Sequence, residues 1–470
     1  MHRRLRSAAL MAIVLVATPG IAQYPLYQAA LTGQAAPSGG KYESFFTPSV
    51  SDSGKVWFKA SLTGGGQGYF VAARSGSAIT TETIAYTGGP TPIGGTYESL
   101  DQTEVYWPND RGEAAFLAAV KGGSAAQGIF KGSTAGVQPV ALVGAAAPGG
   151  LGNYASFPGF WRVNDVGQVL FQASLTGGSA TSGVFVANSG SVTVVAATGA
   201  APGGGTFQRF STTNYGLNNR GQVLFFGSLS TGITGLYMGT PNGISLVARS
   251  FDPAPAGGDY QYFETQPRVN DAGQVAFRTS LVGGTSTEGI FRGGPGGVEI
   301  VALTGRHAHG GQTYTSLFFP MMNEAGQVAF KGGLSNGRSG VFVNTRGSAI
   351  PISLTGDGAP GGGTFTNYAG LLGINGACVI FTATLTGTGV TAASDDGLYS
   401  YSFKSGMHKI AREGDVIDVD VGPGVDLRTV DSILPSVLVN AIATGLSNEY
   451  FAFTLKFTDG SMGVFFTPVP

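Results

Sequence analysis

Acidic residues recur beside a short Asn-x-x-Gly motif, and they are the most repeated groups in the sequence that could bind a metal ion. Four of them follow the Asn position of the motif, namely Asp52, Asp110, Asp165 and Asp271. A calcium loop needs several alternating oxygen ligands in one segment, whereas each motif supplies one carboxylate. Asn can instead open a tight turn by bonding to its own backbone, and Gly can take the positive φ that closes a hairpin. We therefore interpret the motif as a turn and predict no metal site.

Histidine and cysteine side chains offer little further chemistry. His307 and His309 are spaced to share one metal ion, but such a site needs three or four ligands, and the nearest other histidine is His408, in a later part of the sequence. Cys378 is the only cysteine and lies in an apolar run, where a thiol is more often inert than catalytic. We interpret the two histidines as part of a surface loop. No nucleophile elbow, zinc motif or close pair of acids stands out, so we predict no catalytic residue and no cofactor.

The first 22 residues have the pattern of a signal peptide. Arg3, Arg4 and Arg6 precede a short apolar run from Ser7 to Ala17, and small residues end at Ala22, where we predict cleavage. This run is shorter than the roughly 20 residues that a membrane span needs, and no later segment reaches that length. We therefore expect residues 23–470 to form an exported protein, extracellular or periplasmic, without a membrane span.

Composition excludes one class of partner and indicates the fold class. Removing the leader leaves 23 basic and 27 acidic residues, a net charge of about −4. A nucleic-acid-binding domain would show a basic stripe or a high isoelectric point, so we expect no nucleic-acid partner. The 78 glycines and the 11% aromatic content favour tight turns between buried strands. With one cysteine, the fold cannot contain an intramolecular disulfide and must depend on its core.

A tandem repeat runs through the whole chain after the leader. The clearest unit is Asn-x-x-Gly-x-Val-x-Phe, found at Asn164 to Phe171, Asn218 to Phe225, Asn270 to Phe277 and Asn323 to Phe330. Looser copies end at Phe58, Phe116, Phe381 and Phe453. Each copy is followed by a Gly with an apolar pair, such as Gly183-Val184-Phe185, and each unit also has a glycine-rich loop such as Ala359 to Gly363. The sequence therefore contains eight repeats.

The spacing and residue types of each repeat predict four antiparallel strands. In the fifth repeat we place them at Tyr260 to Val269, Gln274 to Leu281, Gly289 to Arg292 and Val298 to Thr304. Four strands every fifty-odd residues, without helices, are typical of propeller blades. We therefore predict an all-β fold, a single eight-bladed β-propeller domain over residues 23–470. The interval from Phe381 to Phe453 is longer, at 72 residues, and we expect an irregular loop at about 419–446.

The two ends of the repeat region complement each other. Residues 27–40 read as the fourth strand of a blade and its loop, before any other strand of that blade has appeared. The last repeat stops after its third strand, Gly463 to Phe466. We predict that Tyr27 to Thr32 pairs antiparallel with Gly463 to Phe466, which would complete the eighth blade and close the ring without an open edge.

These motifs resemble the bacterial choice-of-anchor tandem-repeat proteins, which are marked by Asn-x-x-Gly-x-x-Ala-Phe. That pattern is present literally at Asn270 to Phe277 and Asn323 to Phe330, and the resemblance covers essentially the whole chain after the leader. It implies an exported repeat protein, often with a C-terminal sorting signal of the PEP-CTERM type, and no established activity. The ending Thr467-Pro468-Val469-Pro470 departs from the family, since no apolar span and basic tail follow it.

Charged residues of the innermost strands are the candidate binding residues, because they would face a water-filled channel. They are Glu43, Glu98, Arg162, Arg209, Glu264 and Arg268. Their alternative role is ordinary solvated lining of that channel.

Two functions fit this pattern. The first is a non-catalytic, monomeric binding or scaffold protein for a polysaccharide or a cell-surface component, because repeated rigid loops would form several similar weak sites. The second is a hydrolase or lyase with its site at the channel mouth. A binding protein should present equivalent residues in successive blades, whereas an enzyme should concentrate acids and histidines in one sector.

Overall fold

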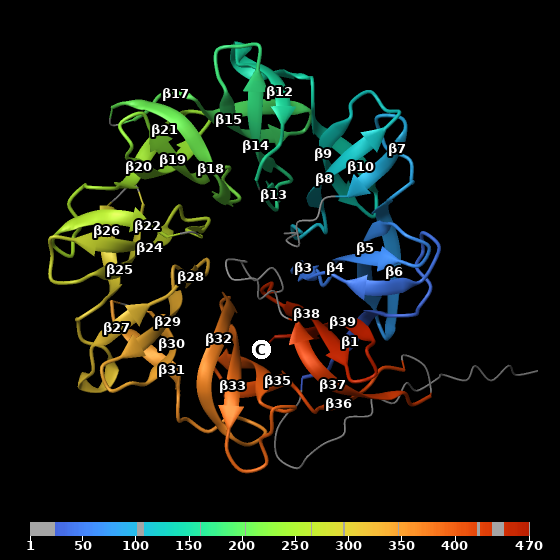
Figure 1. Cartoon of the computed structure of the whole chain (residues 1–470), viewed down its shortest axis with the longest axis vertical. Helices are drawn as coiled ribbons and strands as arrows, with labels where there is room; N and C mark the ends of the chain where they lie inside the picture. Colours follow the sequence, from blue (N-terminus) through green and yellow to red (C-terminus); the bar gives the residue numbers. More distant parts are fainter. Residues whose placement is uncertain are drawn as a thin grey trace, which may run out of the picture.

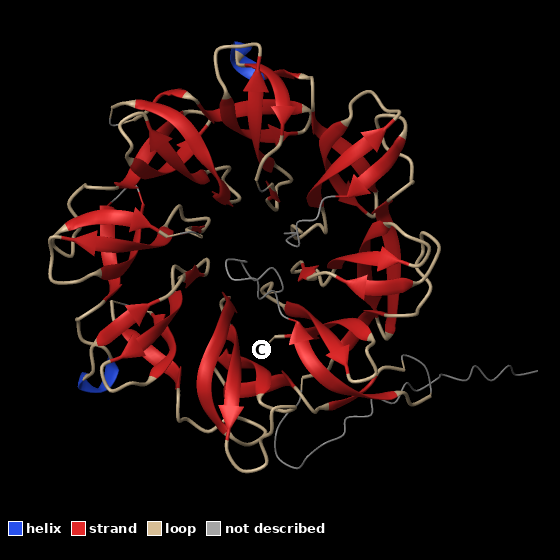
Figure 2. Ribbon diagram, in the orientation of Figure 1, coloured by secondary structure: helices blue, strands red, loops and turns tan. Residues whose placement is uncertain are grey.

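Eight antiparallel sheets are arranged around a central axis in the computed structural model of this protein (Figure 1). The structure describes residues 24–100, 108–159, 161–202, 204–264, 266–294, 297–345, 347–420, 424–434 and 446–469. In this part of the chain the helical segments are two single 3-10 turns, η1 (Pro148–Gly150) and η2 (His309–Gly311), and strands make the blades (Figure 2). The prediction of an all-β, eight-bladed propeller is confirmed.

The strands follow the repeat around the ring. Blade 1 contains β2 (Tyr42–Phe45), β3 (Ser49–Val50), β4 (Val56–Leu62), β5 (Gln67–Ser75) and β6 (Ala78–Tyr86). Blade 2 contains β7 (Thr96–Leu100), β8 (Ala114–Lys121), β9 (Gln127–Ser133) and β10 (Gly136–Leu142). Blade 3 contains β11 (Ala146–Ala147), β12 (Gly152–Ser156), β13 (Arg162–Val163), β14 (Val169–Thr176), β15 (Ser182–Asn188) and β16 (Ser191–Ala197). Blade 4 contains β17 (Gly199–Ala200), β18 (Thr206–Leu217), β19 (Val223–Leu229), β20 (Thr234–Thr240) and β21 (Gly243–Arg249). Blade 5 contains β22 (Asp259–Phe263), β23 (Arg268–Val269), β24 (Val275–Val282), β25 (Glu288–Gly294) and β26 (Gly297–Leu303).

The remaining blades complete the ring. Blade 6 contains β27 (Tyr314–Leu317), β28 (Met321–Met322), β29 (Val328–Leu334), β30 (Ser339–Asn344) and β31 (Ala349–Leu354), and blade 7 contains β32 (Thr364–Ile374), β33 (Cys378–Thr386), β34 (Asp396–Ser402) and β35 (Gly406–Arg412). Blade 8 contains β36 (Val416–Asp418), β37 (Leu427–Leu434), β38 (Tyr450–Phe457), β39 (Met462–Pro468) and β1 (Tyr27–Leu31).

The innermost strand of a blade is interrupted in several copies, which differs from the continuous strand that we predicted. In blade 5, β22 and β23 pair separately with β24. Gln266 lies between them with a φ of 74°, and Pro267 has no N–H to donate to a sheet. The chain therefore bends away from the sheet before it reaches the turn at the centre of the ring.

Aromatic residues of the repeat form the core of each blade. In blade 3, Phe171 stacks on Phe185 with ring centroids 5.4 Å apart, and Tyr154 meets Phe185 edge-on at 5.4 Å. Gly183 makes this packing possible, because a Cβ atom at that position would lie 2.7 Å from Cζ of Phe185. The Gly that precedes each apolar pair in the repeat thus leaves room for the aromatic side chain two residues later.

The ring closes where the first strand meets the last one. Tyr27 pairs with Phe466 and Leu31 pairs with Gly463 in an antiparallel arrangement between β1 and β39. The backbone N–H of Thr32 continues the pairing by donating to the carbonyl oxygen of Met462 at 2.8 Å. This confirms the predicted closure and the antiparallel pairing of the two strands.

The expected irregular loop at 419–446 is only partly irregular, so that prediction is wrong for its central part. Strand β37 lies in this interval and pairs with β38 as the inner strand of blade 8. Val430 in β37 is 1% exposed and belongs to the core between blades 7 and 8. Backbone pairing with β38 and the buried side chain of Val430 place this strand in the sheet. The expected segment also includes 421–423 and 435–445, which lie outside the described residues.

Candidate functional site

Asparagine side chains of the repeat connect neighbouring blades at the centre of the ring. In blade 4, Oδ1 of Asn218 accepts the backbone N–H of Gln222 in its own turn at 2.9 Å. Its Nδ2 donates to the backbone oxygen of Asn270 in blade 5 at 2.9 Å. The same contact joins Asn109 to Asn164, Asn164 to Asn218, Asn323 to Asn375, and Asn375 to Ser447. The motif is therefore a turn, as predicted, and its Asn side chain also forms a hydrogen bond to the neighbouring blade.

The next position of the repeat forms a second set of contacts around the centre of the ring, which we call the rim belt. Its members follow Asn in five copies and follow Ser51 or Ser447 in two others. It consists of Asp52, Asp110, Asp165, Asn219, Asp271, Glu324 and Asn448. Six of the seven backbone N–H groups in this belt donate to the side chain of the next member, for example Asp110 to Oδ1 of Asp165 at 2.9 Å and Asp271 to Oε2 of Glu324 at 2.7 Å. Asn219 also donates from Nδ2 to both Asp165 and Asp271. Because backbone groups hold these oxygens, their positions are fixed before any ligand binds.

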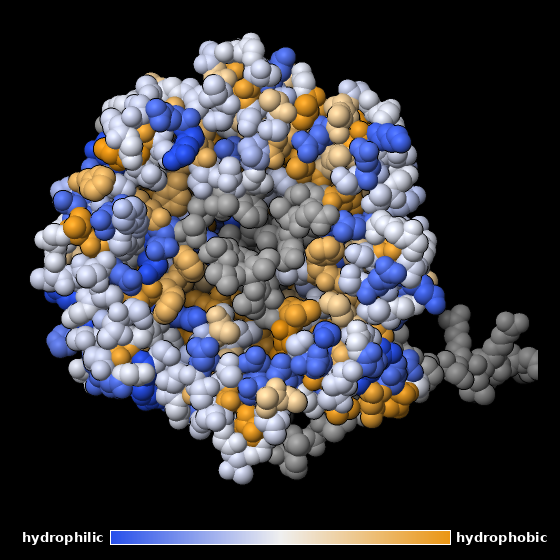
Figure 3. Space-filling model, viewed as in Figure 1, coloured by the Kyte–Doolittle hydropathy of each residue, from blue (hydrophilic) through white to orange (hydrophobic). Residues whose placement is uncertain are grey.

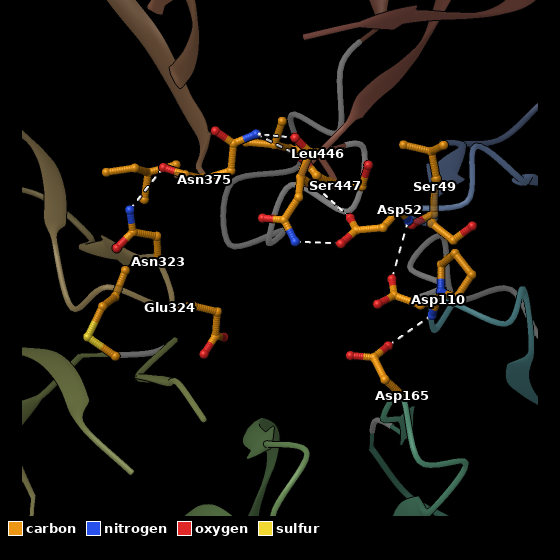
Figure 4. Close-up of a pocket in the computed structure, with 15 residues that line it drawn as sticks. Ser49, Asp52, Asp110, Asp165, Asn323, Glu324, Asn375, Leu446 and Ser447 are labelled. Carbon is orange, nitrogen blue, oxygen red and sulfur yellow. Dashed lines mark hydrogen bonds between the residues drawn. The ribbon is translucent and has the colours of Figure 1, made fainter. Parts of the chain in front are cut away.

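A pocket of about 320 Å³ opens inside the rim belt. In Figure 4, Asp52, Asp110 and Asp165 lie on one side of it, and Glu324, Asn323 and Asn375 lie on the other. Hydroxyl groups of Ser49, Ser51 and Ser447 and apolar side chains of Val50, Met322, Ile374 and Leu446 complete the lining. The pocket thus combines carboxylates, amides and hydroxyls from several blades with a smaller apolar surface.

The carboxylates of the rim belt influence one another. The pKa of Asp110 is raised to about 6, first because packing removes part of its hydration and then because the carboxylates of Asp165 and Asp52 lie nearby. Partial burial also raises the pKa of Glu324, and the charges of Asp271 and Asp165 add to this effect. One sector of the pocket therefore holds a carboxyl group that is half protonated near pH 6.

The described residues contain no group of three or more His, Cys, Asp or Glu side chains arranged to hold a metal ion. The rim carboxylates come from different blades, and their oxygens already accept backbone N–H groups. His307 and His309 are exposed in the loop around η2. Cys378 is buried, and burial raises the pKa of its thiol to about 12, so it is not an activated nucleophile.

The six predicted site residues do not form one cluster. Glu43, Glu98 and Arg209 are exposed on β2, β7 and β18, toward the strand ends that lie away from the central turns. Glu264 forms an ion pair with Arg278 at 2.9 Å. The binding role of these residues stays a prediction.

Two of the six, Arg162 and Arg268, are brought close enough to influence each other. Each lies two residues before the Asn of its motif, and Gly216 occupies the corresponding position in the blade between them. Burial lowers the pKa of Arg268 to about 10, and burial together with the positive charge of Arg268 lowers that of Arg162 to about 9. Nη2 of Arg268 lies 2.9 Å from Sδ of Met321 in blade 6.

The rim belt was not predicted as a unit from the sequence. Four of its acids were predicted as turn residues, whereas Asn219, Glu324 and Asn448 were not singled out. The information was present, because all seven residues occupy the same position of the repeat. An alignment of the eight repeats on the Asn-x-x-Gly turn has a polar residue at this position in seven copies, which predicts a ring of polar side chains.

Fold and site together define a tandem-repeat β-propeller with a polar rim at its centre. The chain belongs to the Family of unknown function (DUF7453), whose model matches residues 22–235, 183–378 and 230–470. The expectation of an uncharacterised repeat family is thereby confirmed. No curated protein matches the chain.

Several solved structures are similar at low identity. A puromycin-hydrolyzing peptidase of Mycobacterium tuberculosis is 11% identical, with a TM-score of 0.41, over 93% of this chain and 62% of that one. An acylaminoacyl peptidase of Pyrococcus horikoshii is 9% identical, with a TM-score of 0.35, over 76% and 53%. A lectin of Aleuria aurantia in complex with Fucalpha1-6GlcNAc is 13% identical, with a TM-score of 0.28, over 65% and 94%. The chain thus spans less than two thirds of either peptidase.

The leader predicted at residues 1–22, with its cleavage site after Ala22, lies outside the described residues. Within the part of the chain that the structure describes, no helix has the length and apolar character to cross a membrane.

Proposed function

We propose that this protein is a non-catalytic extracellular binding or scaffold protein, and that its rim belt binds a polyhydroxylated ligand such as a polysaccharide. The sequence pattern of residues 1–22 and the resemblance to exported choice-of-anchor repeat proteins support export. The observation that carries the binding role is the rim belt itself, a ring of carboxylate and amide groups around a pocket of about 320 Å³.

The chemistry of the rim suits sugar hydroxyls. Carboxylate oxygens accept hydrogen bonds from hydroxyl groups, and the exposed amide of Asn448 lines the same pocket. The partly exposed side chains of Met322 and Leu446 can cover the C–H face of a sugar ring. Since the acids are fixed by backbone hydrogen bonds, little side-chain freedom is lost on binding.

The distribution of polar groups favours binding over catalysis. Rim acids occur at the equivalent position in five blades, at Asp52, Asp110, Asp165, Asp271 and Glu324. An enzyme would be expected to concentrate an acid, a base and a nucleophile in one sector. Repeated groups on one ring instead support several similar contacts along an extended ligand.

A glycan array with the purified protein, residues 23–470, tests this function. We expect selective binding that Asp165→Asn weakens, because this substitution removes a rim charge while keeping the shape of the side chain. Glu82→Gln serves as the matched control, since Glu82 is an exposed acid of β6 in the outer part of blade 1. Absence of binding to every glycan and surface polymer on the array would contradict the proposal.

A second candidate function, a hydrolase or lyase at the channel mouth, is favoured by one observation. Asp110 has a raised pKa and lies beside Asp165, and a protonated and an ionised carboxyl group side by side can act as general acid and base. Incubation with a panel of polysaccharides, followed by an assay of new sugar ends, separates the two functions. Product that disappears in Asp110→Asn would support catalysis.

A further inference from the structure

One position of the repeat carries a polar side chain in six of the eight blades, and in blades 1 and 6 this side chain reaches into the neighbouring blade. It is the residue directly after the central Phe of each unit. Nζ of Lys59 in blade 1 donates to the carbonyl oxygen of Leu100 in blade 2 at 3.4 Å. Nζ of Lys331 in blade 6 donates to the carbonyl oxygen of Ala369 in blade 7 at 3.2 Å and lies over the Phe318 ring.

Blade 4 has a phenylalanine at this position. The ring of Phe226 is 5% exposed and lies against Phe263 of blade 5, with centroids 5.7 Å apart. The ring reaches blade 5 but has no polar end that could extend to a backbone carbonyl there, as Lys59 and Lys331 do in their blades. A pocket of about 260 Å³ lies beside it, between blades 4 and 5.

The polar lining of this pocket also differs from the other blades. Arg209 lies at its edge, at the position where blades 1, 2, 3 and 6 carry Ser44, Ser99, Ser156 and Ser316. Hydroxyl groups of Ser211, Ser228 and Thr234 complete the polar side. No carboxylate is among the described residues that line it, so the charge of the groove is positive.

We propose that the groove between blades 4 and 5 is a binding site for a uronic acid residue of an acidic polysaccharide, with Arg209 pairing with the sugar carboxylate. The site lies apart from the rim belt, because Ser228 and Arg209 pair at the end of β18 and β19 that is distant from the central turn at Asn218. This assignment rests on the proposed polysaccharide-binding function and names a ligand class for a second site.

Each part of a uronate has a counterpart in the groove. A guanidinium group can bind a carboxylate through two parallel N–H donors, which a serine at the same position cannot do. The rings of Phe226 and Phe263 offer apolar surface to the C–H face of a pyranose ring. Ser228 and Thr234 can exchange hydrogen bonds with ring hydroxyls.

Calorimetric titration of the protein, residues 23–470, with a trimer of galacturonic acid tests the site, and the neutral galactose trimer is the comparison ligand. We expect the acidic trimer to bind more tightly, and Arg209→Gln to weaken its binding about tenfold or more while leaving the neutral trimer unaffected. Arg306→Gln is the matched control, because Arg306 is an exposed arginine in the loop after β26 of blade 5. This control should bind like the wild type.

Phe226→Lys supplies a second, independent arm, since it introduces at this position the side chain that fills the space next to blades 1 and 6. It should reduce binding of the acidic trimer, and a thermal melt of each variant reports whether the fold is kept. No binding of the acidic trimer to the wild type, or equal binding by wild type and Arg209→Gln, would overturn the assignment. If the acidic trimer does not bind in the groove but the rim belt still binds a glycan, the proposed function stands and only this assignment is wrong. If the protein binds no glycan at all, the proposed function itself is contradicted.

Discussion

The backbone N–H of Asp110 donates to Oδ1 of Asp165 in the next blade at 2.9 Å, so a carboxylate at the centre of the ring holds its neighbour in place. Oδ2 of Asp165 in turn accepts from Nδ2 of Asn219 at 2.7 Å. Charged groups that would repel one another in water are thereby fixed in a ring by backbone donors. The propeller uses the same residues for its assembly and for the polar surface that it presents to a ligand.

Replacing Asn218 with alanine should destabilise the fold by about 3 kcal/mol, because a buried amide that serves both its own turn and blade 5 is lost. Chemical denaturation gives the free energy of unfolding. Asn242→Ala, in the exposed turn between β20 and β21, is the control and should change stability little. If Asn218→Ala lowers the free energy of unfolding no more than this control does, the inter-blade contact contributes nothing measurable to stability.

Stability should fall as the pH rises from about 4 to about 6. Asp110 has a pKa of about 6 in the folded protein against 3.8 as its ordinary value, so the unfolded chain releases this proton more easily. The folded state is therefore favoured by protonation and loses that contribution as Asp110 ionises. Denaturant titrations at several pH values should show this slope, and Asp110→Asn should flatten it. The same slope in the variant would mean that other groups are responsible.

Cys378 should not react with iodoacetamide in the native protein. It is fully buried, and the raised pKa keeps it as a thiol at neutral pH. Mass spectrometry should find no adduct under native conditions and a single adduct after unfolding in urea. Rapid labelling of the folded protein would show that blade 7 opens far more readily than its packing implies.

Removing residues 23–40 should destabilise the protein by several kcal/mol or cause aggregation. Ala29 and Ala30 of β1 are buried against blades 1 and 8, and Leu31 is buried in the core of blades 7 and 8. The deletion would expose both this apolar surface and the free edge of β39. A circular permutant that carries these residues after the C-terminus should melt like the wild type. A truncated protein with wild-type stability would be incompatible with this closure.

The fold was accessible from the sequence because the repeat encodes each blade locally. The Phe of each unit and the Gly before each apolar pair belong to one blade, and each occurs eight times, once in every blade. Strand β37 was missed because its copy of the repeat is degenerate and lies in the longest interval. Contacts between blades were harder to anticipate, since the partner of Asp110 is 55 residues away and only the ring geometry brings it near.

The placement of the candidate site residues was harder to predict for the same reason, and their binding role stays a prediction. Charged residues of the inner strands were expected to line a channel, but Glu43 and Glu98 point to solvent near the outer strand ends. The strand bends at positions such as Gln266, so distance along the strand does not translate directly into distance from the axis. Only Arg162 and Arg268, next to the central turns, come near one another.

The most direct test of the central claim is to measure binding and turnover together at the rim belt. The glycan that the array selects would be titrated into wild-type protein, Asp165→Asn and Glu82→Gln, and recovered afterwards for mass spectrometry. We predict saturable binding by the wild type and the Glu82 control, weaker binding by the Asp165 variant, and ligand of unchanged mass in every sample. Equal binding by all three proteins, or a cleaved ligand in the wild-type sample, would contradict a non-catalytic binding role for the rim belt.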